Sequence, residues 1–173
     1  MRVLPKFPPR LPAGAHERLG IRPKEKVVAW GAGPGADVTV ASYVAATDRA
    51  LYVEASGERI TWDRISKASW DEPLLELVLL DDSGRPGGLR QLRIDDAKDL
   101  PPAVHDRVVD SVMVSEHVDL VGGAGAQLVA RRGSDDGEVH WSVVFDAGLD
   151  PRDPRLRQAA DAALAEFRSA LGI

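Results

Sequence analysis

Hydrophobic and polar positions alternate through residues 44–70, and this pattern predicts short β-strands joined by tight polar turns. Leu51 and Val53 share one face of the first of these strands. The Ser56-Gly57 pair that follows indicates a hairpin, because glycine reaches positive φ without a steric clash. The alternation stops at residues 62–64 and then resumes, so we expect two shorter strands separated by a kink or a single helical turn.

Residues 74–80 form the most apolar strand of the chain, with leucine or valine on both faces. A strand that is apolar on both faces is normally covered on both faces. Because a barrel interior covers only one of them, we expect another layer outside. Either the C-terminal strands and helix pack on this outer face, or that helix forms a homodimer seam.

Two helices are predicted from apolar stripes. The first has an apolar residue at every fourth position, at Leu100, Val104, Val108 and Val112. The second begins at Pro154, where Asp153 suits the capping position before a first-turn proline, and its stripe is rich in alanine. Between the helices we expect strands at 118–121, 127–131 and 139–145, with Trp141, Val143 and Phe145 on one core face.

Three segments resemble the bacterial pleckstrin-homology-like (PH-like) domains: ATDRALYV (46–53), GERITWDRI (57–65) and LPPAVHDRVVDSVM (100–113). The chain is similar to small actinobacterial proteins of this type, which carry an extra C-terminal segment. The resemblance implies an α+β fold, with a PH-like antiparallel β-barrel or sandwich closed by an amphipathic helix. C-terminal β-strands and a C-terminal helix would follow. The resemblance supplies no catalytic residue, because this fold carries many unrelated binding functions.

The chain of 173 residues is expected to divide into three segments around one core. A basic, proline-rich N-terminal arm occupies residues 1–24. The PH-like domain follows at residues 25–115. A C-terminal β-hairpin and helix at residues 116–173 pack on the same domain.

The net charge of −5 is unevenly distributed. Residues 1–26 contain seven lysines and arginines against two glutamates, a local charge of +5, so the rest of the chain carries −10. An acidic body disfavours nucleic acid, because phosphate neutralisation supplies most of that affinity. The lack of cysteine fits a reducing cytoplasm. No apolar run approaches the ~18 residues of a membrane span. Prolines near the N-terminus interrupt the apolar segment that a signal peptide would need, so none is expected.

Catalytic, cofactor-binding and metal-binding residues are not predicted. The glycines at 31–35 follow a strand expected at residues 26–30, and we expect them to form the turn after it. They do not predict a phosphate-binding loop, because such a loop is followed by a helix and these glycines are followed by residues typical of a strand. The polar segment 81–88 lacks the spacing of a calcium loop. The four histidines, at positions 16, 105, 117 and 140, are too scattered to form a zinc pair.

Three functions from different classes remain open. The first is a non-catalytic interaction module of the cytoplasm, which binds a protein or peptide at the barrel rim or along an exposed strand edge. The alternative is a peripheral anionic-lipid binder that uses the basic arm with Arg49, Arg59 and Arg64. The second alternative is an enzyme without a recognisable motif. An exposed tryptophan among Trp30, Trp62 and Trp70 would mark a contact site.

Overall fold

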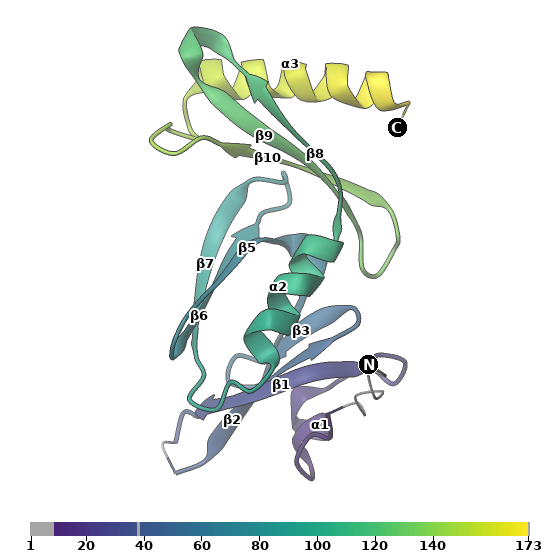
Figure 1. Ribbon diagram of the computed structural model, residues 1–173, viewed down its shortest axis with the longest axis vertical. Coiled ribbons are helices and arrows are strands. Elements are labelled where there is room, and N and C mark those ends of the chain that lie inside the picture. Colours follow the sequence, from purple (N-terminus) through teal and green to yellow (C-terminus); the bar gives the residue numbers. More distant parts are fainter. Residues whose placement is uncertain (1–8, 38, 173) are drawn as a thin grey trace, which may run out of the picture.

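The computed structural model describes residues 9–37 and 39–172, which form three antiparallel sheets and three α-helices (Figure 1). The fold is therefore α+β, as predicted, and none of the three sheets closes into a barrel. The strand orders are β1-β2-β3-β4, β5-β6-β7 and β10-β9-β8. The helices are α1 (Ala15–Leu19), α2 (Leu100–Asp110) and α3 (Pro154–Leu171). The strands are β1 (Val27–Pro34), β2 (Ala41–Thr47), β3 (Ala50–Val53), β4 (Glu58–Thr61), β5 (Ile65–Asp71), β6 (Leu74–Leu80), β7 (Pro86–Arg93), β8 (Val112–Asp119), β9 (Gly125–Arg132) and β10 (Val139–Phe145).

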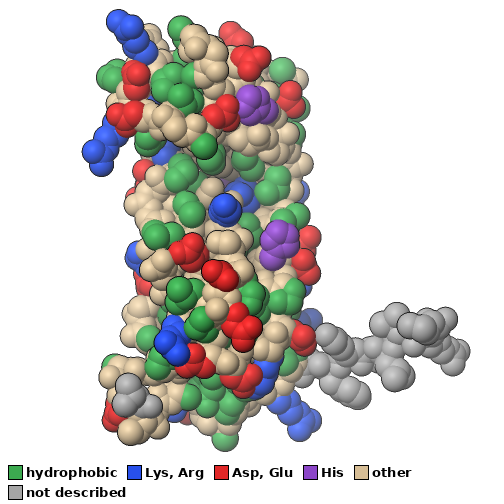
Figure 2. All heavy atoms as spheres, turned by 60° about the vertical axis from the view of Figure 1, so that its left-hand side comes forward, with side chains coloured by type: hydrophobic (Ala, Val, Ile, Leu, Met, Phe, Trp, Pro, Cys, Tyr) green, Lys and Arg blue, Asp and Glu red, His purple; other side chains and the backbone are tan. Residues whose placement is uncertain are grey.

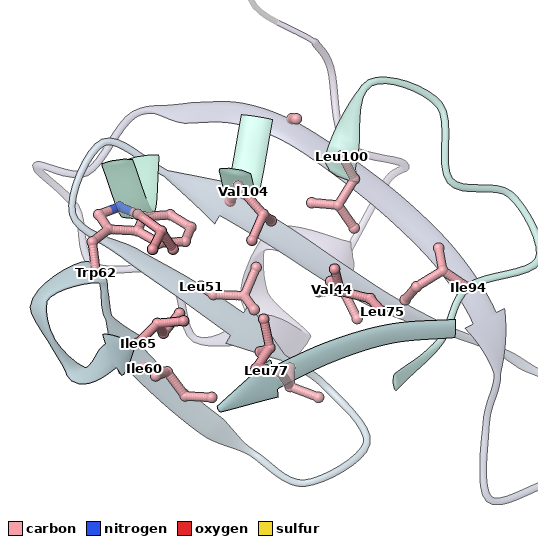
Figure 3. Close-up of a cluster of buried hydrophobic side chains, with 14 residues drawn as sticks. Val44, Leu51, Ile60, Trp62, Ile65, Leu75, Leu77, Ile94, Leu100 and Val104 are labelled. Carbon is pink, nitrogen blue, oxygen red and sulfur yellow. The ribbon is translucent and has the colours of Figure 1, made fainter. Parts of the chain in front are cut away.

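The first two sheets enclose the main hydrophobic core, and α2 packs over it. Leu51 from β3, Leu77 from β6 and Val104 from α2 lie in this cluster (Figure 3), and all three are fully buried. The apolar stripe predicted for the first helix is thus confirmed at its centre. Val112 is the exception: the helix ends at Asp110, and Val112 begins β8.

The turns predicted between residues 44 and 70 are confirmed. Gly57 has a φ of 65° in the hairpin that joins β3 to β4. Residues 62–64 form a single 3₁₀ turn between β4 and β5. The direction of the chain therefore changes twice within a short stretch, and this brings β5 into the second sheet.

The glycine-rich turn expected at residues 31–35 is wrong, because β1 continues through Gly31 and Gly33 to Pro34. The glycines serve a close approach between backbones. A side chain at Gly33 would overlap the carbonyl group of Arg93, and one at Gly31 would press on Ile94. The reason for glycine here lies in a segment about 60 residues away, which no local pattern contains.

The N-terminal arm is described from residue 9 onward, and residues 1–8 lie outside the described part. Residues 9–24 include the short helix α1. They pack on the outer face of the four-stranded sheet through the buried side chains of Leu19 and Ile21. This segment therefore contributes a second, smaller hydrophobic cluster to the body.

Strands β8, β9 and β10 and helix α3 form a C-terminal tier, which has its own core. Helix α3 covers one face of β10-β9-β8, with Ala160 packed near Leu128 and Val143. The indole of Trp141 meets the ring of Phe167 edge-on, with centroids 5.7 Å apart. The Asp153 side chain caps α3 by accepting a hydrogen bond from the Arg155 N–H. The predicted cap and the predicted packing role of the aromatic face are both confirmed.

The expectation that this helix covers the outer face of β6 is wrong. Helix α3 lies over its own sheet, away from β6 (Figure 1). The outer face of the second sheet is partly open, with Leu74 39% and Leu89 55% exposed. The leucines of β6 that are deeply buried, Leu75 and Leu77, face the main core. The homodimer seam stays a prediction.

The C-terminal tier joins the body through polar contacts. The Val143 N–H donates to the Gly84 carbonyl at 3.1 Å, across the edge of β10. The buried guanidinium of Arg131 donates to the carbonyls of Ser66 in β5 and Val108 in α2, at 3.1 Å each. Because Val108 lies in the last turn of α2, a cation is favourable there.

Candidate functional site

A groove of about 640 Å³ runs between the edge strand β1 and helix α2. Ligand sites in proteins commonly have volumes of about 300–1,000 Å³. On one side it is lined by residues 26–30, and on the other by Lys98, Asp99, Pro102, Ala103 and Asp106; Pro9 also contributes. It is larger than four other surface cavities of the protein, which have volumes of about 210–360 Å³.

The backbone N–H and C=O of Trp30 lie on the side of edge strand β1 that faces the groove. The Ala32 N–H donates to Asp96 at 3.0 Å and its carbonyl accepts from Asp96 at 2.9 Å, both on the side of β1 away from β2. Backbone groups alternate between the two sides of an antiparallel strand, and the β1–β2 register is unbroken from Ala29 to Pro34. The N–H and C=O of Trp30 therefore also point away from β2, where a further strand could pair with them.

The floor of the groove is apolar because it forms part of the body's packing. Val28 and Ala103 are half-buried against the main core, from β1 and α2 respectively. A bulge in β1 lies between Val27 and Ala29. Bulges redirect side chains at sheet edges. The groove thus combines an apolar floor with an exposed backbone edge.

The indole of Trp30 contacts two side chains at the rim of the groove, Tyr43 and Lys98. It meets the Tyr43 ring edge-on, with centroids 5.8 Å apart. The ammonium of Lys98 lies 3.2 Å from the centre of the indole ring and also pairs with Asp96 at 3.2 Å. Lys98 has a φ of 47°, a left-handed conformation that is uncommon for residues other than glycine. Such backbone conformations concentrate at binding sites.

The other two tryptophans flagged by the sequence lie in different surroundings. Trp62 is 3% exposed, and its indole N–H donates to the Thr47 carbonyl, so it belongs to the core. Trp70 is half-buried beside a smaller cavity of about 300 Å³ on the β5 side of α2, together with His105. Trp30 is therefore the tryptophan at the larger groove.

The arginines expected to contact lipid are bound to the protein itself. Arg59 donates two hydrogen bonds to Asp135, at 2.8 and 2.7 Å, and others to the buried Glu25. Arg64 pairs with Asp82, and Arg49 donates to the Ser134 carbonyl. Acidic and basic side chains are also interspersed on the face that Figure 2 shows. Arg59 and Arg64 are thus paired with carboxylates, and Arg49 is bound to a backbone carbonyl.

Arg59 joins the sheet to the loop between β9 and β10, and this contact depends on pH. The hydrogen bond from Arg59 lowers the pKa of Asp135, the charges of Arg59 and Arg22 act in the same direction, and partial burial opposes them. A carboxyl group whose pKa is lowered on folding stabilises the protein above its unfolded pKa of about 3.9. That stabilisation disappears as the pH falls below this value.

We expect Asp135→Asn to lower the free energy of unfolding by only about 1 kcal/mol near neutral pH, because solvent screens the contact and the Asp135 side chain is 42% exposed. The difference from the wild type should shrink as the pH falls below about 4. Denaturant unfolding at several pH values measures it. Asp82→Asn is the matched control, since the Asp82 side chain is fully exposed and should contribute little. A difference that is independent of pH would contradict the assignment.

The remaining polar candidates have structural partners. Asp81 accepts hydrogen bonds from Ser83 and Arg85, which lower its pKa and form the turn before β7. His117 and His140 each contact one aspartate, Asp146 and Asp136, at the protein surface. Within residues 9–37 and 39–172, no group of three or more potential ligand side chains could hold a metal ion.

A strand edge is the type of site that the sequence predicts, but the sequence identifies neither β1 nor Lys98 as part of it. The contact between Lys98 and Trp30 joins residues 68 positions apart, which no local pattern reveals.

None of the described helices is long and apolar enough to cross a membrane. Comparisons with family models, curated proteins and solved structures found no match to this chain.

Proposed function

We propose that this protein is a non-catalytic interaction module of the cytoplasm, which binds an extended segment of a partner protein in the groove between β1 and α2. The segment would lie antiparallel or parallel to β1 and pair with the outward N–H and C=O of Trp30. Its apolar side chains would contact Val28 and Ala103. In this mode, known as strand addition, the backbone supplies affinity and the pockets supply specificity.

The observation that carries the proposal is the position of the groove directly along a strand edge. Asp96 already pairs with Ala32 on this edge, so the chain itself begins a short additional ladder. The next outward position toward the start of β1 is Trp30, which faces the groove. A partner strand would continue the ladder from there, over an apolar floor.

The arrangement of the body supports the PH-like interpretation. A four-stranded and a three-stranded antiparallel sheet share one core, and a helix follows the seventh strand and packs over that core. Antiparallel strands followed by a helix that covers their core agree with the sandwich form of the resemblance. The lipid-binding alternative has less support, because Arg49, Arg59 and Arg64 have partners within the protein.

A random library of short peptides, selected on the purified protein and measured by calorimetry, tests the proposal. We expect selected peptides to bind the wild type, and Ala103→Gln to weaken them about tenfold, because the longer uncharged side chain fills the groove. Ala165→Gln, at an exposed alanine of α3, is the matched control and should bind like the wild type.

Both variants are compared by thermal melting, so that loss of binding is separated from loss of folding. Peptides that bind both variants equally would place the site elsewhere. A library that yields no binder would overturn the proposal, and binding to anionic vesicles instead would return the question to lipid.

A further inference from the structure

At the groove, one positively charged side chain of the protein contacts both an aromatic ring and a carboxylate. The Lys98 ammonium lies 3.2 Å from the centre of the Trp30 ring, well within the distance at which a cation is attracted to an aromatic face. Tryptophan is the most favourable ring for this interaction. The same ammonium is paired with the Asp96 carboxylate at 3.2 Å.

Trp30 and Asp96 are fixed relative to each other by the backbone. Asp96 exchanges two hydrogen bonds with Ala32, and Ala32 lies two residues after Trp30 on β1. The residues that carry the ring and the carboxylate therefore lie side by side on the edge where a partner strand would add. A lysine or arginine on that strand would meet both groups.

Lys98 itself is a replaceable occupant. Its side chain is 43% exposed and the Asp96 side chain is 59% exposed, and exposed ion pairs contribute little to stability. Its φ of 47° also makes it the single residue other than glycine with positive φ in the described part of the chain. A flexible, exposed side chain on a strained backbone can swing away when a second cation arrives.

The charge of the body favours a cationic partner. Outside residues 1–26 the chain carries −10. At the groove itself, Asp99 and Asp106 on the α2 side lie opposite Lys26 on the β1 side. Potentials of opposite sign raise association rates and exclude wrong partners.

We infer that the partner segment carries a lysine or arginine that binds between the Trp30 ring and Asp96, and that Lys98 fills this position until the partner displaces it. This inference rests on the proposed strand addition and names the charge that the groove selects.

The test uses a small probe, N-acetyl-lysine methylamide, with its uncharged norleucine analogue as the comparison. Binding to the full-length protein is followed by the indole N–H resonance of Trp30. Lys98→Gly removes the competing ammonium and suits the positive φ. We expect it to bind the lysine probe about threefold more tightly than the wild type does, and to leave the norleucine probe weak.

Lys26→Ala is the matched control, because it removes another positive charge that lines the groove without touching the Trp30 ring. It should not reproduce the gain. Lys98→Asn, which also tolerates positive φ, guards against a loop change peculiar to glycine. Equal binding of both probes, equal gains in both lysine variants, or no gain in either Lys98 variant would overturn the inference.

The measurement with the lysine and norleucine probes is independent of the peptide selection. A library that yields binders without any preference for lysine or arginine would leave strand addition in place and contradict the cation site. A library without binders removes the proposed function, whatever the probe shows at Trp30.

Discussion

Replacing Leu77 by aspartate is expected to abolish folding of the body. Leu77 lies on β6 with no exposed surface, in the cluster that also contains Leu51 and Val104. Removal of a buried leucine side chain alone costs about 2–5 kcal/mol, and an unpaired carboxylate in an apolar core adds a larger penalty. The total reaches the stability of a typical domain, about 5–15 kcal/mol. Circular dichroism and thermal melting should show no cooperative transition.

Leu89→Asp is the matched control for this substitution. Leu89 lies on the neighbouring strand β7, in register with Val78, and is 55% exposed. An aspartate there stays in water, so the variant should melt close to the wild type. If Leu77→Asp kept a cooperative transition near the wild-type temperature, β6 would not be central to the core, and the shared packing of the two sheets would be wrong.

The elements that were predicted correctly are those set by residues close in sequence. Alternation placed Leu51 and Val53 on a strand, and the spacing of Leu100, Val104 and Val108 defined α2. The stripe of α2 marks the side of the helix that is buried. In β3, by contrast, all four residues are buried, because the N-terminal segment covers the face opposite Leu51 and Val53. The cap at Asp153 is likewise a contact with the first turn of its own helix.

The elements that were missed depend on contacts between distant residues. Gly33 reads as a turn in isolation, yet it allows β1 to pass the backbone of Arg93. Helix α3 carries an apolar stripe, but the stripe does not say which sheet it covers. Both the β6 face and the C-terminal sheet offered apolar positions, and only the structure shows that α3 packs on the latter.

The candidate site also has features that the sequence predicts and features that only the structure shows. The sequence drew attention to Trp30 as one of several tryptophans and to a strand edge as a binding element. It also named Arg59 as a lipid contact, because a single arginine gives no sign that Asp135 and Glu25 will bind it. Electrostatic partners across 30 or more positions must be read from the structure.

Deleting residues 154–173 should convert the protein into an aggregating species. Helix α3 buries one face of β10-β9-β8, where Leu128 is fully buried and Val143 is 5% exposed. Without the helix, this face is uncovered and Trp141 loses its edge-on partner, Phe167. A three-stranded sheet needs such a cover, and large exposed apolar patches drive association. We expect little soluble protein and strong binding of a hydrophobic dye, compared by size-exclusion chromatography with the full chain.

A chain that ends after Ser169 is the control, because it keeps Ala160 and Phe167, whose packing forms the C-terminal core. It should remain soluble and melt like the wild type. If the longer deletion were soluble and equally stable, the sheet would not need α3 as its cover, and the alanine-rich helix would be free to pack against a second copy. The oligomeric state of the full chain would then distinguish a homodimer seam from a peripheral helix, since only the seam predicts a dimer that the deletion turns into a monomer.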